Sequence, residues 1–195
     1  MPPPARILIT AFRPFQGRSS NGSATLLRWL RSRYPRRTFV SSILPVDWVQ
    51  APLQLRRLLA WHRPSAVLSM GEGQPGRVAW ECRAVNFHHG TDETGRNRAP
   101  SVIDQGAAGV LRTRLPHPSG SASLPASHPL VISEDAGTFL CNRLLWEALR
   151  ITRGRAGFLH LPPQDPQPDA SYCLALGSFL NDFLLEFCNV SPPRV

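Results

Sequence analysis

The sequence contains no lysine, and its 22 residues of the lysine and arginine class are therefore all arginine. The formal net charge is +9 at pH 7, and a positive charge of this size attracts nucleic acids. The arginines are nevertheless scattered, apart from short pairs such as Arg36-Arg37, and no nucleic-acid-binding motif accompanies them. A coding bias toward arginine, proline and alanine explains this composition, so we expect no nucleic-acid partner.

Long hydrophobic runs are also absent. No stretch of about eighteen apolar residues occurs, which excludes an ordinary membrane-spanning helix. Residues 1–6 lead directly into Ile7 without the apolar stretch and cleavage site of a signal peptide. We therefore expect no membrane contact and a cytoplasmic location. With 42% apolar and 18% charged residues, residues 1–195 have the composition and size of a single globular domain.

Cysteine is scarce, and its spacing excludes a common type of metal site. The four cysteines are too far apart to form a Cys-x-x-Cys pair, so we expect no zinc site of the usual spacing. Without a secretory signal, they are expected to be free thiols. These residues are Cys82, Cys141, Cys173 and Cys188.

Short apolar runs alternate with amphipathic stretches along the chain. This alternation predicts an α/β domain with a mainly parallel sheet that has helices on both faces. The expected strands are residues 6–12, 38–44, 65–70, 78–87, 130–133 and 155–161, and the expected helices are residues 19–34, 48–61, 142–150 and 172–187.

Two segments lack the pattern of a regular element. Residues 116–129 are rich in proline and serine, which predicts a flexible surface loop. Residues 71–76 match the glycine pattern of dinucleotide-binding proteins, but Pro75 lies inside the turn and the following residues alternate like a strand. The pyrophosphate site of that pattern requires a helix immediately afterwards. We therefore expect a turn between two strands and no nucleotide cofactor.

Cys141 has the sequence setting of a reactive thiol. It lies between an expected strand and the start of an expected helix. The positive end of a helix stabilises a thiolate, and unpaired N–H groups in the first turn can bind an oxyanion. Cys141 is therefore the candidate nucleophile.

A thiol nucleophile needs a base, and the base needs a group that orients it. His160 is the best candidate base, since it ends an apolar strand, where α/β proteins place their sites. Glu81 is the first candidate for the orienting group because it interrupts a mostly uncharged segment. Glu134 and Asp135 are rivals because they lie close to Cys141 in the sequence.

These residues lie in segments that resemble the pyroglutamyl peptidase I family, the pyrrolidone carboxyl peptidases. Residues 136–142 match the nucleophile motif of the family almost residue for residue, and residues 156–162 match its histidine motif. Glu81 and residues 84–86 resemble the stretch that carries the catalytic glutamate. The order of glutamate, cysteine and histidine is also that of the family. Further similar segments are residues 7–17, 21–23, 44–48 and 71–77.

The resemblance implies an α/β/α sandwich that needs no cofactor and removes an N-terminal pyroglutamyl residue from peptides. It implies that Cys141 attacks the pyroglutamyl carbonyl. It also implies that His160 takes the thiol proton and gives it to the leaving amine, and that Glu81 orients His160. Phe12 and Phe15 correspond to aromatic residues that enclose the flat lactam ring, which suits a neutral planar group. Members of the family form tetramers or monomers, so a homo-oligomer is compatible with the resemblance.

The sequence departs from the family pattern at two positions. Glu72 stands where the family carries glutamine, and Gln74 is near it, so both are candidate substrate-binding residues. Thr91 stands where the family carries an arginine linked to oxyanion stabilisation, and Arg83 and Arg96 are candidate replacements. These departures motivate a second hypothesis, in which the protein binds a small ligand or a partner without peptidase activity.

Overall fold

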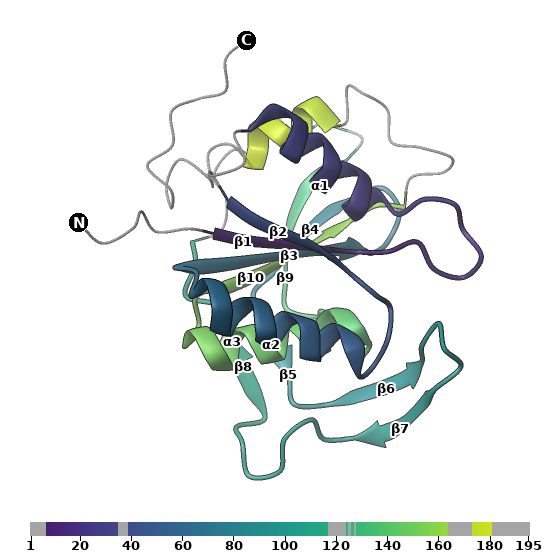
Figure 1. The fold of residues 1–195 in the computed structure, drawn as a ribbon, viewed down its shortest axis with the longest axis vertical. Helices are drawn as coiled ribbons and strands as arrows, with labels where there is room; N and C mark the ends of the chain where they lie inside the picture. The colour runs from purple at the N-terminus through teal and green to yellow at the C-terminus, as the bar shows by residue number, and fades with distance from the viewer. Residues whose placement is uncertain are drawn as a thin grey trace.

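A six-stranded sheet forms the centre of the molecule (Figure 1). The computed structural model describes residues 7–34, 39–116, 124, 126, 128–163 and 173–180. Within these residues the strand order is β2-β1-β3-β10-β4-β9, and the only antiparallel pair in this sheet joins β10 to β4. The prediction of a mainly parallel sheet is therefore confirmed. The strands are β1 (Ile7–Phe12), β2 (Phe39–Leu44), β3 (Ala66–Glu72), β4 (Val78–Glu81), β9 (Leu130–Ser133) and β10 (Ala156–Leu161).

Helices cover both faces of the sheet. One face carries α1 (Gly22–Arg33) and the helical residues 173–180 (Figure 1). The opposite face carries α2 (Gln50–His62) and α3 (Leu140–Thr152). This arrangement is the three-layer α/β/α sandwich that the sequence predicts.

The alternation of side chains along β1 explains why this strand reads as a continuous apolar run. Ile7 and Ile9 join the core on the side of α1, whereas Leu8 joins the core formed with α2 and α3. All three residues are completely buried. Because successive side chains point to opposite faces, a strand covered on both faces must be apolar throughout.

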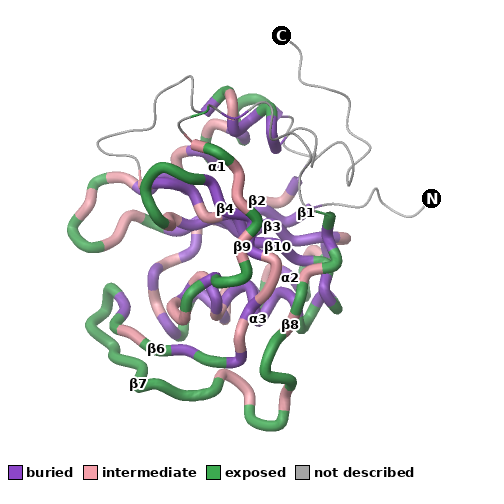
Figure 2. The backbone as a smooth tube through the Cα atoms, turned by 180° about the vertical axis from the view of Figure 1, so that it is seen from behind, coloured by how far each residue is buried: buried purple, intermediate pink, exposed green. Residues whose placement is uncertain are grey.

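The chain leaves the central sheet between β4 and β9 to form two small antiparallel pairs. The first pair is β5 (Arg83–Val85) with β8 (Val110–Arg112), and the second is β6 (His88–Thr91) with β7 (Asn97–Ser101). Much of this excursion is exposed, in contrast to the buried central strands (Figure 2).

The expected single strand over residues 78–87 is wrong. The chain changes partners at Cys82, whose N–H donates to the carbonyl of Ser133 at 2.7 Å, while its own carbonyl accepts from the N–H of Thr113 at 2.9 Å. The apolar alternation continues across this point although the pairing changes from β9 to β8. The pattern of side chains alone therefore could not place the break.

The glycine-rich segment after β3 forms the expected turn between two strands. Strand β3 continues through Glu72, and β4 begins at Val78 without an intervening helix. The structure therefore confirms that the dinucleotide pattern lacks its helix.

Other expectations fall partly outside the described residues. Most of the predicted loop at residues 116–129 is not described, and of the predicted last helix the structure describes residues 173–180, which are helical. The flexible loop and the single domain over residues 1–195 remain predictions. Among the described residues, no helix has the length and apolarity to cross a membrane.

Candidate active site

Cys141 is the second residue of α3. The helix follows the connection from β9 and has Phe139 as its N-cap residue. The first hydrogen bond of the helix runs from the N–H of Arg143 to the carbonyl of Phe139 at 3.0 Å. The N–H groups of Leu140, Cys141 and Asn142 precede this bond and have no partner within the helix, as at any helix N-terminus. The thiol therefore lies at the positive end of α3, beside donors that suit an anion.

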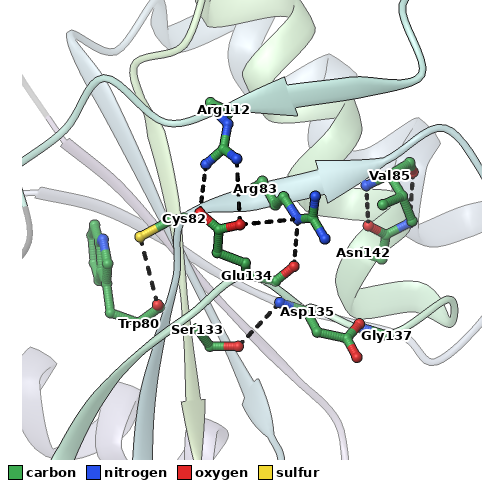
Figure 3. Close-up of polar contacts among 10 residues, drawn as sticks. All are labelled: Trp80, Cys82, Arg83, Val85, Arg112, Ser133, Glu134, Asp135, Gly137 and Asn142. Carbon is green, nitrogen blue, oxygen red and sulfur yellow. Dashed lines mark hydrogen bonds and ion pairs between the residues drawn. The ribbon is translucent and has the colours of Figure 1, made fainter.

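Asn142 fixes this helix to the excursion of the chain. Its side chain is completely buried and accepts from the N–H of Val85 at 2.8 Å (Figure 3). Its amide nitrogen donates to the carbonyls of Val85 and Phe87, both at 2.9 Å. Buried polar groups are costly when unpaired, so these three bonds hold the first turn of α3 in one position against β5.

His160 and Glu81 meet across the single antiparallel pair of the central sheet. Glu81 lies opposite Phe158 in the pairing of β4 with β10, and His160 is two residues further along β10. The two side chains are therefore diagonal neighbours on one face. Nδ1 of His160 lies 2.8 Å from Oε1 of Glu81, and the Glu81 side chain is only 2% exposed. This contact can hold the imidazole ring of His160 in one orientation.

The surroundings of His160 favour its protonated form. Burial lowers the pKa of His160, but the charge and hydrogen bond of Cys141, together with the hydrogen bond and charge of Glu81, outweigh burial and raise this pKa to about 10. The thiol of Cys141 therefore lies close enough to the imidazole for their charges to interact. An imidazolium at this position stabilises a thiolate and holds a proton for a leaving group.

The two rival carboxylates have other partners. Glu134 forms an ion pair with Arg112 at 2.8 Å, and its backbone carbonyl accepts from Nε of Arg83 at 2.6 Å (Figure 3). Oδ1 of Asp135 accepts from the N–H of Gly137 at 3.0 Å. These contacts tie the segment before α3 to β5 and β8, whereas the contact with His160 belongs to Glu81.

Two glycines, Gly71 at the end of β3 and Gly73 just after it, make room for Cys141 and His160. A Cβ atom added at Gly71 would lie 2.9 Å from Cζ of Phe158 and 3.2 Å from Sγ of Cys141. A Cβ atom added at Gly73 would lie 2.7 Å from Cβ of His160 and 3.0 Å from its Cγ. The glycines thus allow the backbone to approach Cys141 and His160 closely.

Gly73→Ala is expected to reduce turnover by about tenfold or more, because a displaced catalytic group loses its alignment. Atoms at 2.7 Å must move apart, and the Cβ of His160 is held by the backbone of β10. The matched control is Gly109→Ala, since an added Cβ there meets no atom within 4 Å. Steady-state kinetics measures both variants. Equal activity of Gly73→Ala and Gly109→Ala would contradict the expectation that a side chain at position 73 displaces His160.

Cys141 lies at the boundary of two cavities. The first is largely apolar and is lined by Phe12, Phe15, Asn21, Val46, Glu72, Phe139, Leu140 and Cys141. The second is a more polar cleft lined by Glu72, Gly73, Gln74, Arg77, Ala79, Glu81, Asp135, Ala136, Gly137, Thr138, Phe139, Cys141 and His160. A substrate can therefore place a compact apolar group in the first cavity and extend into the second.

The structure separates the four candidate binding residues between these cavities. Phe12 and Phe15 line the apolar cavity together with Cys141, and Glu72 borders both cavities. Gln74 lines only the polar cleft. Gln74 is therefore placed to contact the part of a substrate that extends away from the apolar cavity.

Neither Arg83 nor Arg96, the expected substitutes for the family arginine at position 91, lines either cavity. Arg83 bonds to the carbonyl of Glu134, and Arg96 lies 3.5 Å from Asp47. Thr91 itself lies on β6, exposed and outside both linings. The arginine that does line the cleft is Arg77, the last residue of the segment 71–77 that resembles the family.

Some lining residues were missed as site residues by the sequence analysis. Asn21 borders the apolar cavity and is also the N-cap of α1, where its Oδ1 accepts from the N–H of Ser23 at 3.0 Å. Val46 and Phe139 complete the apolar lining. Asn21 and Val46 lie within segments that resemble family motifs, and this resemblance could have identified them as site residues.

The described residues contain no group of three or more histidine, cysteine, aspartate or glutamate side chains that could hold a metal ion. Within the same residues Cys82, Cys141 and Cys173 form no disulfide. The thiol of Cys141, the imidazole of His160 and the carboxylate of Glu81 line the same cleft.

The chain is similar in sequence to known proteins. The family model for pyroglutamyl peptidases matches residues 5–170. The pyrrolidone-carboxylate peptidase of Vibrio vulnificus is 31% identical over 175 residues, which cover 85% of this chain and 82% of that protein. The corresponding protein of Clavibacter michiganensis is 34% identical over 166 residues, which cover 80% of this chain and 78% of that protein.

Solved structures share the fold. The pyrrolidone carboxyl peptidase from Thermococcus litoralis aligns with a TM-score of 0.78 and 22% identity, covering 97% of this chain and 100% of that one. The pyroglutamyl peptidase I from Bacillus amyloliquefaciens aligns with a TM-score of 0.79 and 24% identity, covering 94% and 95%. Together with the sequence matches, these findings show that the chain belongs to the pyroglutamyl peptidase family.

Proposed function

We propose that this protein is a cysteine peptidase that removes an N-terminal pyroglutamyl residue from peptides, with Cys141, His160 and Glu81 as its catalytic residues. Membership of the pyroglutamyl peptidase family supports the reaction. The observation that carries the residue assignment is the position of Cys141 between the two cavities, beside a His160 that is bonded to Glu81.

The reaction begins with the thiolate of Cys141. It attacks the carbonyl carbon of the pyroglutamyl residue, and the resulting oxyanion accepts hydrogen bonds from the N–H groups of the first turn of α3. The C–N bond then breaks, and His160 gives its proton to the leaving amine. The products of this step are the shortened peptide and a pyroglutamyl thioester on Cys141.

Water completes the reaction. His160 removes a proton from a water molecule, which attacks the thioester carbonyl. The carbon–sulfur bond breaks, pyroglutamate leaves, and the sulfur is again paired with the imidazolium. Glu81 keeps Nδ1 of His160 occupied throughout, so that Nε2 faces the reacting atoms.

The two cavities explain selection of an N-terminal residue. The lactam ring is compact, flat and neutral, which suits the apolar cavity that Phe12 and Phe15 help to line. The peptide that follows the ring lies in the polar cleft, with Gln74, Arg77 and Asp135 along it. We also place the reaction in the cytoplasm, because the mechanism needs a reduced thiol.

Hydrolysis of a pyroglutamyl coumarin amide by the purified protein tests this proposal, with the glutaminyl amide as the matched substrate. We expect turnover of the pyroglutamyl amide alone, since an uncyclised glutamine carries a charged amine and a longer side chain. Failure to release the coumarin under reducing conditions would favour the alternative of a ligand-binding protein without peptidase activity.

A further inference from the structure

The apolar cavity contains one charged side chain, that of Glu72. Its neighbours in the lining include Phe12, Phe15 and Val46, and the side chain of Glu72 is only 3% exposed. A carboxylate removed from water in apolar surroundings is costly unless it is paired. The charge of Glu72 must therefore be compensated for a neutral ring to bind beside it.

Two groups compensate this charge: Arg18 in the connection from β1 to α1, and the first residue of α1. Nη1 of Arg18 lies 2.5 Å from Oε2 of Glu72. The N–H of Gly22, the first residue of α1, donates to Oε1 at 2.7 Å. Arg18 is 26% exposed and does not line the cavity. It therefore acts on the cavity through Glu72 alone.

We propose that Arg18 is a specificity-determining residue, which cancels the charge of Glu72 so that the cavity selects a neutral lactam over a cationic ring of the same size. The proposal rests on the proposed function. The relevant competitor is an N-terminal proline, whose five-membered ring carries a protonated secondary amine in place of the neutral lactam amide.

The physical basis is the balance of charge in the cavity. With Arg18 present, Glu72 keeps lone pairs free to accept the lactam N–H, while the pair as a whole has no net charge. A prolyl ammonium loses its hydration on entering the cavity and gains no net attraction, because Arg18 already pairs with Glu72. Without Arg18, Glu72 keeps the hydrogen bond from Gly22 but has no cationic partner, so the carboxylate attracts this cation and is poorly matched to a neutral ring.

Arg18→Ala is expected to raise KM for a pyroglutamyl coumarin amide about tenfold, with kcat changed much less, since Arg18 does not touch the reacting atoms. The ratio of kcat/KM for the pyroglutamyl amide to that for the prolyl amide should fall by about tenfold or more. Arg57→Ala is the matched control, because Arg57 is an exposed arginine on α2 outside both cavities.

The double variant Arg18→Ala/Glu72→Gln separates charge compensation from a structural role. An uncharged glutamine needs no partner charge, so the double variant should recover the low KM and the selectivity, with thermal melting used to verify folding. An unchanged KM and ratio in Arg18→Ala, or a loss that Glu72→Gln does not rescue, would overturn the inference. If the wild-type protein does not hydrolyse the pyroglutamyl amide, the proposed function is overturned together with this inference.

Discussion

Cys141→Ala should reduce hydrolysis of a pyroglutamyl amide by about ten-thousand-fold or more, because the variant has no group that can form the acyl intermediate. The thiol occupies the start of α3, at the junction of the apolar cavity and the polar cleft. Alanine fits the same position without new contacts. Steady-state kinetics at high enzyme concentration measures the residual rate.

The matched control for this variant is Cys173→Ala. Cys173 also forms no disulfide, but it lies in the helical segment on the opposite face of the sheet from α3. We expect this control to keep the wild-type rate. Substantial turnover in Cys141→Ala would show that a different residue is the nucleophile.

His160→Gln should lower kcat about a thousandfold, since both proton transfers pass through the imidazole. Glutamine retains a hydrogen-bonding side chain on β10 but cannot exchange a proton at neutral pH. The effects of Cys141 and His160 should be far from additive because the two act as one unit. A double variant that is much slower than Cys141→Ala alone would contradict the claim that the two residues act together.

The pH profile provides an independent check on His160. Its pKa is raised to about 10, by Cys141 and by Glu81 against the lowering effect of burial. The imidazolium that protonates the leaving amine is present below this pH, so kcat/KM should fall as the pH rises through it. Glu81→Gln removes part of the raising effect and should move this alkaline limb to lower pH by about one unit or more.

Measurement of kcat/KM for the wild type and Glu81→Gln from about pH 6 to pH 11 locates the alkaline limb of each profile. A limb that stays in place in Glu81→Gln would show that Glu81 does not set the proton affinity of His160. Arg83→Gln is a suitable control, because Arg83 bonds to the carbonyl of Glu134 and lines neither cavity.

Apolar periodicity was sufficient to predict the layers of the fold. The run from Ile7 to Ile9 identified a strand buried on both faces, and the spacing of leucines identified α1, α2 and α3 to within a few residues. Cys141 and His160 could be placed from the same pattern because each lies at the end of a regular element. Glu81 was the first candidate for the orienting group because it interrupts a mostly uncharged segment, and the resemblance to a family favoured it over Glu134 and Asp135.

Features that depend on distant contacts could not be predicted. Strand β7 contains no buried residue, so its sequence lacks the alternation that identifies a strand. The pairing of Arg18 with Glu72 joins residues 54 positions apart, and no local pattern indicates it. Arg83 and Arg96, the expected substitutes for the family arginine at position 91, line neither cavity, whereas Arg77 lines the cleft.

The central claim is that Cys141 carries a pyroglutamyl thioester during turnover. Rapid acid quenching of the protein with a pyroglutamyl ester, followed by mass spectrometry of its peptides, measures this directly. We predict one added pyroglutamyl group, located on the peptide that contains Cys141 and absent from the Cys141→Ala variant. Turnover without any acylated peptide, or with the acyl group on another residue, would contradict the account.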